Sequence, residues 1–294
     1  MGVGAEILVL RDGRPLEVRE YGDPGGHPAF FFHGLLGSYH QASYVSEQAE
    51  RAGLRIIAPN RPGVGRSEFV ARRSALEAVP DIEDLTKILG IGEFSVIGIS
   101  GGTPYALGVL YRLGERVRTA TVISGMGPSH LPGSLRGMDA RRRLVLAAGS
   151  RAPRLARNVF RHAGRRFHAH PERFLERLVK TWATADRRLF DRREVFELFL
   201  EDIRQVFANS EGAEGMAQEL RLYRTYGFPL HRLPADRRVT LWHGLTDNIV
   251  PPAMAWKMVQ ALPDAEAHIL PGGHFMAINT ADLIVNRLVQ QLRL

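Results

Sequence analysis

The most informative stretch of this sequence runs from residue 94 to residue 114 and reads FSVIGISGGTPYALGVLYRLG. Its first six residues form a short, almost wholly apolar run, which is typical of a strand buried on both faces of a parallel sheet. Residues 103–113 carry a helical pattern, and a glycine follows them. Between strand and helix lies GISGG, residues 98–102, which fits G-x-S-x-G. This context predicts a sharp turn that lifts the Ser100 hydroxyl above the sheet, at a helix N-terminus whose dipole favours developing negative charge.

Short apolar runs and helical patterns alternate on both sides of this stretch. Such alternation is typical of an α/β protein with a mostly parallel, doubly wound sheet, and the turn Asp12-Gly13 predicts a hairpin at its start. We expect strands at residues 7–10, 16–21, 29–32, 55–58, 94–99, 119–123, 238–242 and 267–270, and helices at residues 81–89, 103–113, 254–261 and from residue 280 onward.

The alternation stops after residue 124 and resumes at residue 238. Between about residues 139 and 226 the apolar spacing is helical throughout. An all-helical insertion in an α/β sheet would lie as a lid over the sheet edge. We therefore predict a core made of residues 1–125 and 236–294 and a helical cap made of residues 126–235. An aromatic stripe at positions 174, 182, 196, 199 and 207 could face a substrate, but we expect at least half of it to pack the cap's own interior.

Two further strand ends carry polar residues that suit catalysis with a serine nucleophile. Asp247 follows the run at residues 238–242 and enters a loop, where its carboxylate can hold an imidazole in one tautomer. His274 lies in the glycine-bounded loop PGGHF, residues 271–275, after the run at residues 267–270. The chain order serine, aspartate, histidine is the one expected of this arrangement. The other strand end that could supply an acid, at residues 124–125, reads Ser-Gly and offers no carboxylate.

With these motifs in place, the chain resembles the α/β-hydrolase superfamily over residues 5–125 and 236–294. The segment NRPGVGRS, residues 60–67, is similar to the family's D-x-P-G-x-G-x-S loop and departs from it at Asn60, where the family usually has aspartate. That departure bears on local hydrogen bonding rather than on the chemistry. A serine at the elbow distinguishes the chain from the dehalogenase and epoxide hydrolase branches, which use aspartate there.

The resemblance implies a two-step reaction in which His274 removes the proton of Ser100 and an acyl-enzyme forms. It also implies an oxyanion hole made of two backbone N–H groups, those of Leu35 and Gly101. His33, which precedes Leu35 in the sequence FHGL, is expected to hold this loop rather than to act as a base. The expected substrate is a small molecule with an ester-like carbonyl, and neither a metal nor an organic cofactor is needed.

Net charge is concentrated in one part of the chain. The protein has a formal charge of +8, and residues 126–235 contain 21 Lys+Arg against 12 Asp+Glu, nearly all of the basic residues being arginine. Arginine-rich codon usage explains such a bias, and a basic patch for an anionic substrate or surface is the alternative. Nucleic-acid binding is not expected, because no recognised motif accompanies the charge.

Composition excludes several other classes. The chain has no cysteine, so it has no disulfide framework, no thiolate metal site and no cysteine nucleophile. Residues 1–21 lack the pattern of a signal peptide, and no apolar run is long enough to span a bilayer. We therefore expect a cytoplasmic protein without stable membrane insertion.

Two alternatives stay open at this stage. The same three residues could serve C–C bond hydrolysis, perhydrolysis or a biosynthetic cyclisation, because these outcomes differ in pocket shape and in the access of water. The chain could also be a non-catalytic ligand-binding member of the family, although such proteins usually lack the serine or the histidine.

Overall fold

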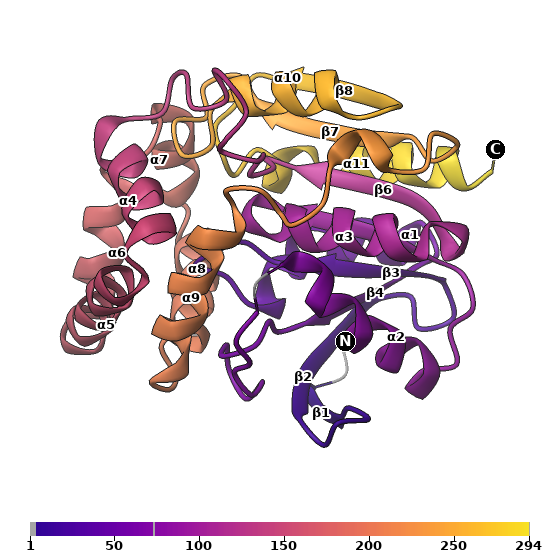
Figure 1. Ribbon diagram of the computed structural model, residues 1–294, viewed down its shortest axis with the longest axis horizontal. Coiled ribbons are helices and arrows are strands. Elements are labelled where there is room, and N and C mark those ends of the chain that lie inside the picture. Colours follow the sequence, from indigo (N-terminus) through magenta and orange to yellow (C-terminus); the bar gives the residue numbers. More distant parts are fainter. Residues whose placement is uncertain (1–3, 73, 294) are drawn as a thin grey trace.

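The computed structural model describes residues 4–72 and 74–293 and contains one eight-stranded sheet with helices on both faces (Figure 1). The strand order across the sheet is β1-β2-β4-β3-β5-β6-β7-β8. The strands are β1 (Glu6–Val9), β2 (Pro15–Gly22), β3 (His27–Phe32), β4 (Leu54–Pro59), β5 (Phe94–Ile99), β6 (Val117–Ile123), β7 (Val239–Gly244) and β8 (Ala265–Leu270). This architecture confirms the predicted α/β fold with a mostly parallel sheet and inserted helices.

Two edges of the sheet differ from the pattern expected of fully buried parallel strands. Strand β2 pairs antiparallel with both β1 and β4, whereas β3 to β8 pair in parallel. Strand β8 is only partly buried along its whole length, because it is the last strand of the sheet. The predicted hairpin around Asp12-Gly13 is present as β1 and β2, with Gly13 at φ +87° in the turn.

Two apolar layers cover the faces of the sheet. One packs α2, α3 and α10 against it, and the other packs α1 and α11. A proline at the first turn and a glycine directly after the last residue bound α3, which agrees with its predicted extent. The last helix begins three residues earlier than expected and is kinked at Thr280. These helices are α1 (Ser46–Arg51), α2 (Val79–Ile88), α3 (Thr103–Leu113), α10 (Pro252–Ala261) and α11 (Ala277–Leu292).

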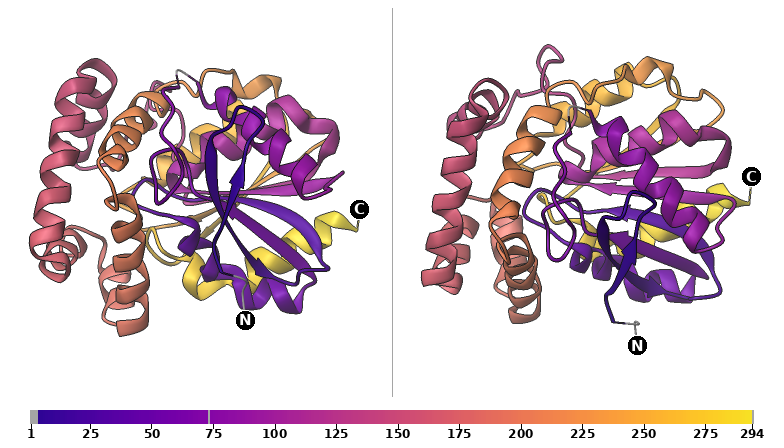
Figure 2. Two further views of the ribbon diagram at one scale, coloured as in Figure 1. Left: turned by 90° about the horizontal axis from the view of Figure 1, so that it is seen from below. Right: turned by 60° about the horizontal axis from the view of Figure 1, so that its bottom comes forward.

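The remaining helices, α4 to α9, lie between β6 and β7 in the chain and stack beyond one end of the sheet (Figures 1 and 2). We call them the helical insertion. They comprise α4 (Ala140–Arg151), α5 (Pro153–Ala169), α6 (Pro171–Val179), α7 (Thr184–Phe190), α8 (Arg193–Val206) and α9 (Glu211–Leu222). Whether the insertion is a separate domain with the boundaries predicted above stays a prediction, and residues 1–3, 73 and 294 of the predicted core lie outside the described residues.

The insertion faces the carboxyl ends of the parallel strands (Figure 1). Ser100 directly follows β5, and the loop after β7 leads to Asp247. This is the edge at which open α/β sheets usually bind ligands. Within the described part of the chain, no helix combines the length and the apolar character needed to cross a bilayer.

Candidate active site

Ser100 occupies a strained turn between β5 and α3. Its φ of +50° is in the left-handed region, which is rare for a residue with a side chain and is often found at functional sites. Steric contacts allow only glycine at the neighbouring positions 98 and 102. A Cβ on Gly98 would lie 2.9 Å from Ala106 Cβ, and a Cβ on Gly102 would lie 1.9 Å from the carbonyl oxygen of Phe32. The G-x-S-x-G pattern is therefore explained by close packing of the turn against β3 and α3.

The structure brings Ser100, His274 and Asp247 into one hydrogen-bonded chain. The Ser100 hydroxyl lies 2.9 Å from His274 Nε2, and His274 Nδ1 lies 2.7 Å from Asp247 Oδ2. The other carboxylate oxygen of Asp247 accepts hydrogen bonds from the backbone N–H groups of Ile249 and Val250, both at 2.9 Å. The carboxylate is thus fixed from both sides, and it leaves Nε2 of a neutral imidazole free to accept the serine proton.

Burial and charge act in opposite directions on the two titratable groups. Burial favours the neutral form of Asp247, but the charge of His274 and the hydrogen bonds from His243 and His274 hold the pKa of this carboxyl below its usual range. For His274, burial lowers the pKa, but Asp247, and more weakly the Asp186 carboxylate, raise it above its ordinary value. A carboxylate that stays ionised beside a more basic imidazole is the combination that a general base needs.

Two side chains that the sequence analysis did not single out support this chain. His243 lies at the end of β7 with Nε2 2.8 Å from the carbonyl oxygen of Val250 and 3.4 Å from Asp247 Oδ2. Ser124, at the end of β6, donates its hydroxyl to the carbonyl oxygen of His274 at 2.7 Å. The strand end that lacks a carboxylate therefore helps to fix the histidine loop.

The two expected oxyanion donors lie beside the serine. Leu35 N lies 3.2 Å from the point that a Cβ on Gly101 would occupy, and a Cβ on Gly34 would lie 3.3 Å from Ser100 Cβ. Gly101 is in the first turn of the helical segment after Ser100, where backbone N–H groups have no partner within the helix. Both N–H groups are therefore available near the serine hydroxyl.

A buried arginine holds the backbone of this region. Arg61 donates to the carbonyl oxygens of Gly34 at 2.6 Å and Gly101 at 3.0 Å, and forms an ion pair with Glu219 of α9 at 3.0 Å. The Gly34 carbonyl belongs to the same peptide group as the Leu35 N–H. The guanidinium therefore fixes and polarises one of the two candidate oxyanion donors.

His33 has the structural position expected for it. It is fully buried, its Nδ1 lies 2.9 Å from the Gly34 carbonyl oxygen, and its Nε2 accepts the backbone N–H of Arg61 at 3.1 Å. Burial and the nearby Arg61 charge lower its pKa well below the ordinary histidine value, which keeps the ring neutral. Both ring nitrogens are used within the loop, so His33 is not placed to exchange protons with a substrate.

The departure from the family pattern at Asn60 has a local explanation. The Asn60 amide accepts a hydrogen bond from the backbone N–H of Tyr39 at 2.8 Å and donates one to Glu17 Oε2 at 3.0 Å. Glu17 is itself buried. An aspartate at position 60 would place two carboxylates in contact, whereas the amide satisfies both neighbours.

One residue of the helical insertion reaches the histidine loop directly. Asp186, on α7, accepts the backbone N–H groups of His274 at 2.9 Å and Phe275 at 3.0 Å. Its side chain is buried, and a Cβ on Gly273 would lie 2.1 Å from its Oδ2 atom. Because Gly273 has no side chain, the Asp186 carboxylate, which comes from a distant segment, fits against the loop that carries His274. Burial raises the pKa of Asp186, and the two backbone hydrogen bonds oppose this rise.

Phe275 extends the same contact through aromatic packing. Its ring centroid lies 4.7 Å from that of Trp182, 4.8 Å from Phe190 and 5.3 Å from Phe199, all of the insertion or its connections. By contrast, Phe174 and Phe207 pack with Phe167 inside the insertion. The aromatic stripe seen in the sequence therefore divides between the insertion's own interior and the histidine loop.

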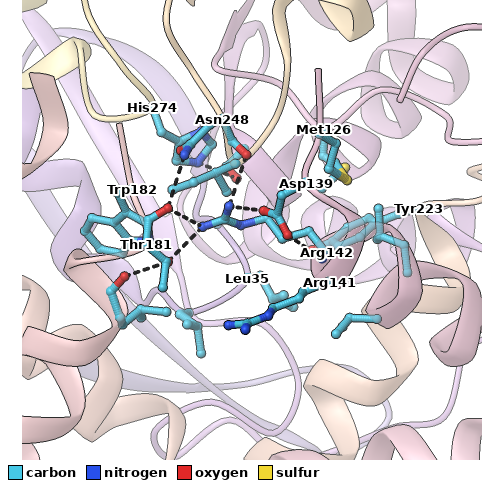
Figure 3. Close-up of a pocket in the computed structure, with 18 of the residues that line it drawn as sticks. Leu35, Met126, Asp139, Arg141, Arg142, Thr181, Trp182, Tyr223, Asn248 and His274 are labelled. Carbon is cyan, nitrogen blue, oxygen red and sulfur yellow. Dashed lines mark hydrogen bonds and ion pairs between the residues drawn. The ribbon is translucent and has the colours of Figure 1, made fainter. Parts of the chain in front are cut away.

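A cavity of about 830 Å³ opens between the sheet edge and the insertion, with Ser100 and His274 in its wall (Figure 3). Its lining is mostly apolar. The core contributes Leu35, Ile99 and Phe275, among others, and the insertion with its connections contributes Met138, Val145, Leu146, Phe160, Leu178, Trp182, Phe199 and Leu220. A volume in this range suits a small organic ligand.

Polar groups gather at one part of this cavity. Arg142 of α4 forms an ion pair with Asp139 and donates to Thr181 Oγ1 at 3.0 Å and to the carbonyl oxygen of Asn248 at 3.2 Å (Figure 3). It thereby ties two parts of the insertion to the loop that carries Asp247. Arg141 also lines the cavity, and it makes no ion pair with any residue that the structure describes.

The structure brings together the three side chains that the sequence predicted, but the residues that support them were not predicted. Ser100, Asp247 and His274 each follow a strand and lie in or beside a recognisable motif, and the same holds for Leu35 and Gly101. Asp186 and Glu219 carry no such signal, because their roles depend on contacts between distant segments. His243 lies at the end of a strand, but its contacts with Val250 and Asp247 depend on how the following loop folds back. Within residues 4–72 and 74–293, no group of three or more His, Asp or Glu side chains is arranged to hold a metal ion.

Comparisons with known proteins agree with this geometry. Residues 29–280 match the family described as alpha/beta hydrolase fold. Among solved structures, the chain is similar to an esterase from Exiguobacterium antarcticum, with 17% identity, a TM-score of 0.70 and all of both chains covered. A thermophilic esterase from Thermogutta terrifontis shares 18% identity over 99% of this chain and 98% of its own, with a TM-score of 0.68. The enol-lactonase from Burkholderia xenovorans LB400 shares 17% sequence identity over 98% of this chain and 100% of its own, with a TM-score of 0.69. At these identities the structural likeness concerns the fold.

Proposed function

Because the chain belongs to the α/β-hydrolase family, we propose that it is a serine hydrolase that cleaves an ester-like carbonyl substrate through an acyl-enzyme. The observation that carries this proposal is the continuous chain from Ser100 through His274 to Asp247, with contacts of 2.9 Å and 2.7 Å. The two backbone N–H groups of Leu35 and Gly101 lie beside the serine and complete the set of groups that acyl transfer requires.

In the first step, His274 Nε2 takes the proton of the Ser100 hydroxyl as the oxygen attacks the carbonyl carbon. The carbonyl π bond breaks, and the negative charge that develops on its oxygen is stabilised by the N–H groups of Leu35 and Gly101. Asp247 stabilises the imidazolium that forms without taking its proton. His274 then protonates the leaving alcohol, and the acyl group stays on Ser100.

In the second step, a water molecule loses its proton to His274 and attacks the acyl-enzyme carbonyl. The tetrahedral intermediate uses the same two N–H donors, and its collapse returns the proton to Ser100 and releases a carboxylic acid. Apart from the substrate and this water molecule, every group used in the two proposed steps belongs to the chain.

We further propose that the helical insertion acts as a cap that selects the substrate. The cavity beneath it is mostly apolar and measures about 830 Å³, and many of its apolar lining residues come from the insertion. Apolar surface favours a hydrophobic acyl or alcohol group, since each buried methylene contributes about 0.8 kcal/mol. Esters with medium or long hydrocarbon portions are therefore the expected substrates.

The proposal is tested by labelling with a fluorophosphonate and by turnover of a panel of p-nitrophenyl esters. We expect the label on Ser100, and we expect Ser100→Ala to lower turnover about 10³-fold or more while the protein stays folded. Ser43→Ala, at a serine whose hydroxyl donates to the carbonyl oxygen of His40, is the matched control and should leave turnover unchanged. Label on another residue together with full activity of Ser100→Ala would overturn the assignment. Labelling of Ser100 without turnover of any ester would instead favour C–C hydrolysis or another reaction of the same three residues.

A further inference from the structure

A second hollow lies on the helical insertion, outside the catalytic cavity. This groove, with a volume of about 580 Å³, lies where α5 is followed by α6. Three arginines, Arg166, Arg173 and Arg177, line it together with His170, and no acidic residue is part of the lining. Its remaining walls are Ala169, Phe174, Leu178 and Thr181. The groove therefore combines concentrated positive charge with an apolar floor.

None of the three arginines forms an ion pair with a described residue. Some other arginines of the insertion do pair with nearby carboxylates, as Arg161 does with Glu214 and Arg193 with Glu197. Three guanidinium groups in one groove repel one another unless an anion is present. The local charge of the groove is thus not balanced by the protein itself.

The groove adjoins the catalytic cavity, because Leu178 and Thr181 line both. Thr181 is the residue that Arg142 contacts at the polar part of the cavity (Figure 3). Arg141, another cation without an ion-pair partner among the described residues, also lines the cavity and directly precedes Arg142 in the chain. A ligand that extends past Leu178 and Thr181 would pass from apolar walls to a cluster of arginines.

We propose that this groove binds a phosphate-type anionic group at the far end of the substrate, whose hydrophobic part lies in the catalytic cavity. The inference rests on the proposed hydrolase function and names its substrate class: an amphiphilic ester with a terminal phosphate. A dianion matches three clustered guanidinium groups better than a single carboxylate does, and guanidinium forms paired hydrogen bonds with phosphate oxygens. The positive excess that the sequence places in residues 126–235 then has a function at this groove.

The test compares two synthetic esters that share an acyl group and differ at the end of the alcohol, where one carries a phosphate and the other a hydroxyl. In the unmodified enzyme the phosphate ester should have a KM about tenfold lower. In Arg173→Gln/Arg177→Gln most of this advantage should be lost, while kcat and the KM of the neutral ester stay within twofold. The matched control is Arg165→Gln/Arg188→Gln, which removes the same charge from exposed positions that do not line the groove. It should keep most of the preference.

Three outcomes would overturn the proposal: no preference for the phosphate ester, equal losses in the two double variants, or loss of binding to anionic lipid vesicles in the groove variant with KM unchanged. The last outcome would assign the groove to a membrane surface. Calorimetry with a non-hydrolysable amide analogue of the phosphate ester and Ser100→Ala protein measures binding without catalysis. If the analogue binds through the groove but no ester is turned over by the unmodified enzyme, the proposed hydrolase function fails and the anion site stands.

Discussion

The α/β core and the helical insertion contribute to the candidate site in different ways. The core supplies the candidate catalytic residues, each on a loop that directly follows a strand, and a Cβ at its Gly98 or Gly102 would lie less than 3 Å from a neighbouring atom. The insertion together with its connections supplies most of the residues that line the cavity, and Asp186 of the insertion holds the backbone of the histidine loop. Under the proposed function, the chemistry depends on the strand ends of the core, whereas substrate fit and the exact position of His274 depend on the insertion. Changes in the two regions should therefore have different kinetic signatures.

The largest effect is expected for a core residue. Asp247→Asn preserves shape but removes the charge that holds His274 in the required tautomer, so kcat should fall by up to about 10⁴-fold. The fold should survive, because the amide oxygen can still accept the N–H groups of Ile249 and Val250. Stopped-flow or steady-state turnover of an ester, with thermal unfolding as a check on folding, measures this. Asp282→Asn, at an exposed ion pair, is the control. A loss of less than tenfold would show that Asp247 does not orient the histidine.

A smaller effect is expected for the carboxylate of the insertion. Asp186→Asn should lower kcat about 10- to 100-fold, because two backbone N–H groups lose a charged acceptor. The Asp186 charge is one of the causes that raise the pKa of His274, so its removal lowers that pKa. His274 then becomes neutral at lower pH, and the acid limb of the kcat/KM profile should move to lower pH.

The control for this prediction is Asp191→Asn, an exposed residue at the end of the same helix. It should alter neither kcat nor the pH profile. A fall in kcat for Asp186→Asn with an unmoved acid limb would mean that Asp186 only stabilises the loop. An unchanged kcat would separate the insertion from the chemistry altogether and would sharpen the division between the two regions.

The same division explains what could be predicted from sequence. The strands of the core, the elbow at Ser100 and the loops of Asp247 and His274 were predicted because each depends on local patterns: apolar runs, glycines and chain order. Asp186 could not be predicted, since its partner lies 88 residues away and its helix resembles any amphipathic helix. The antiparallel pairing of β2 with β4 was also missed, because strand direction is set by connection geometry rather than by the pattern of apolar residues.

Selectivity for the acyl chain should respond to changes in the part of the insertion that lines the cavity. Leu146 of α4 lines the cavity and is buried, so Leu146→Trp should fill part of it and lower kcat/KM for long-chain esters about tenfold or more relative to short-chain esters. Leu144 lies on the same helix, is 70% exposed and does not line the cavity, which makes Leu144→Trp the matched control. If the relative rates for esters with different acyl-chain lengths do not change in Leu146→Trp, the insertion only covers the site and does not determine substrate selectivity.

The smallest effect concerns long-range electrostatics. The positive excess lies in residues 126–235, with 21 basic against 12 acidic residues, while the whole chain has a charge of +8. The field of this region should steer anionic esters toward the cavity mouth and raise kcat/KM a few-fold over that of neutral esters. Steering weakens as the Debye length falls from about 30 Å at 0.01 M salt to about 10 Å at 0.1 M salt.

The measurement is kcat/KM for the phosphate-terminated and hydroxyl-terminated esters across this salt range. Unlike the local contact in the groove, this field should survive in Arg173→Gln/Arg177→Gln at reduced strength, because most of the excess arginines remain. Equal, salt-independent values for both esters would leave the arginines of the insertion as a solvated helix surface, and the difference between the two regions would then be one of shape and not of charge.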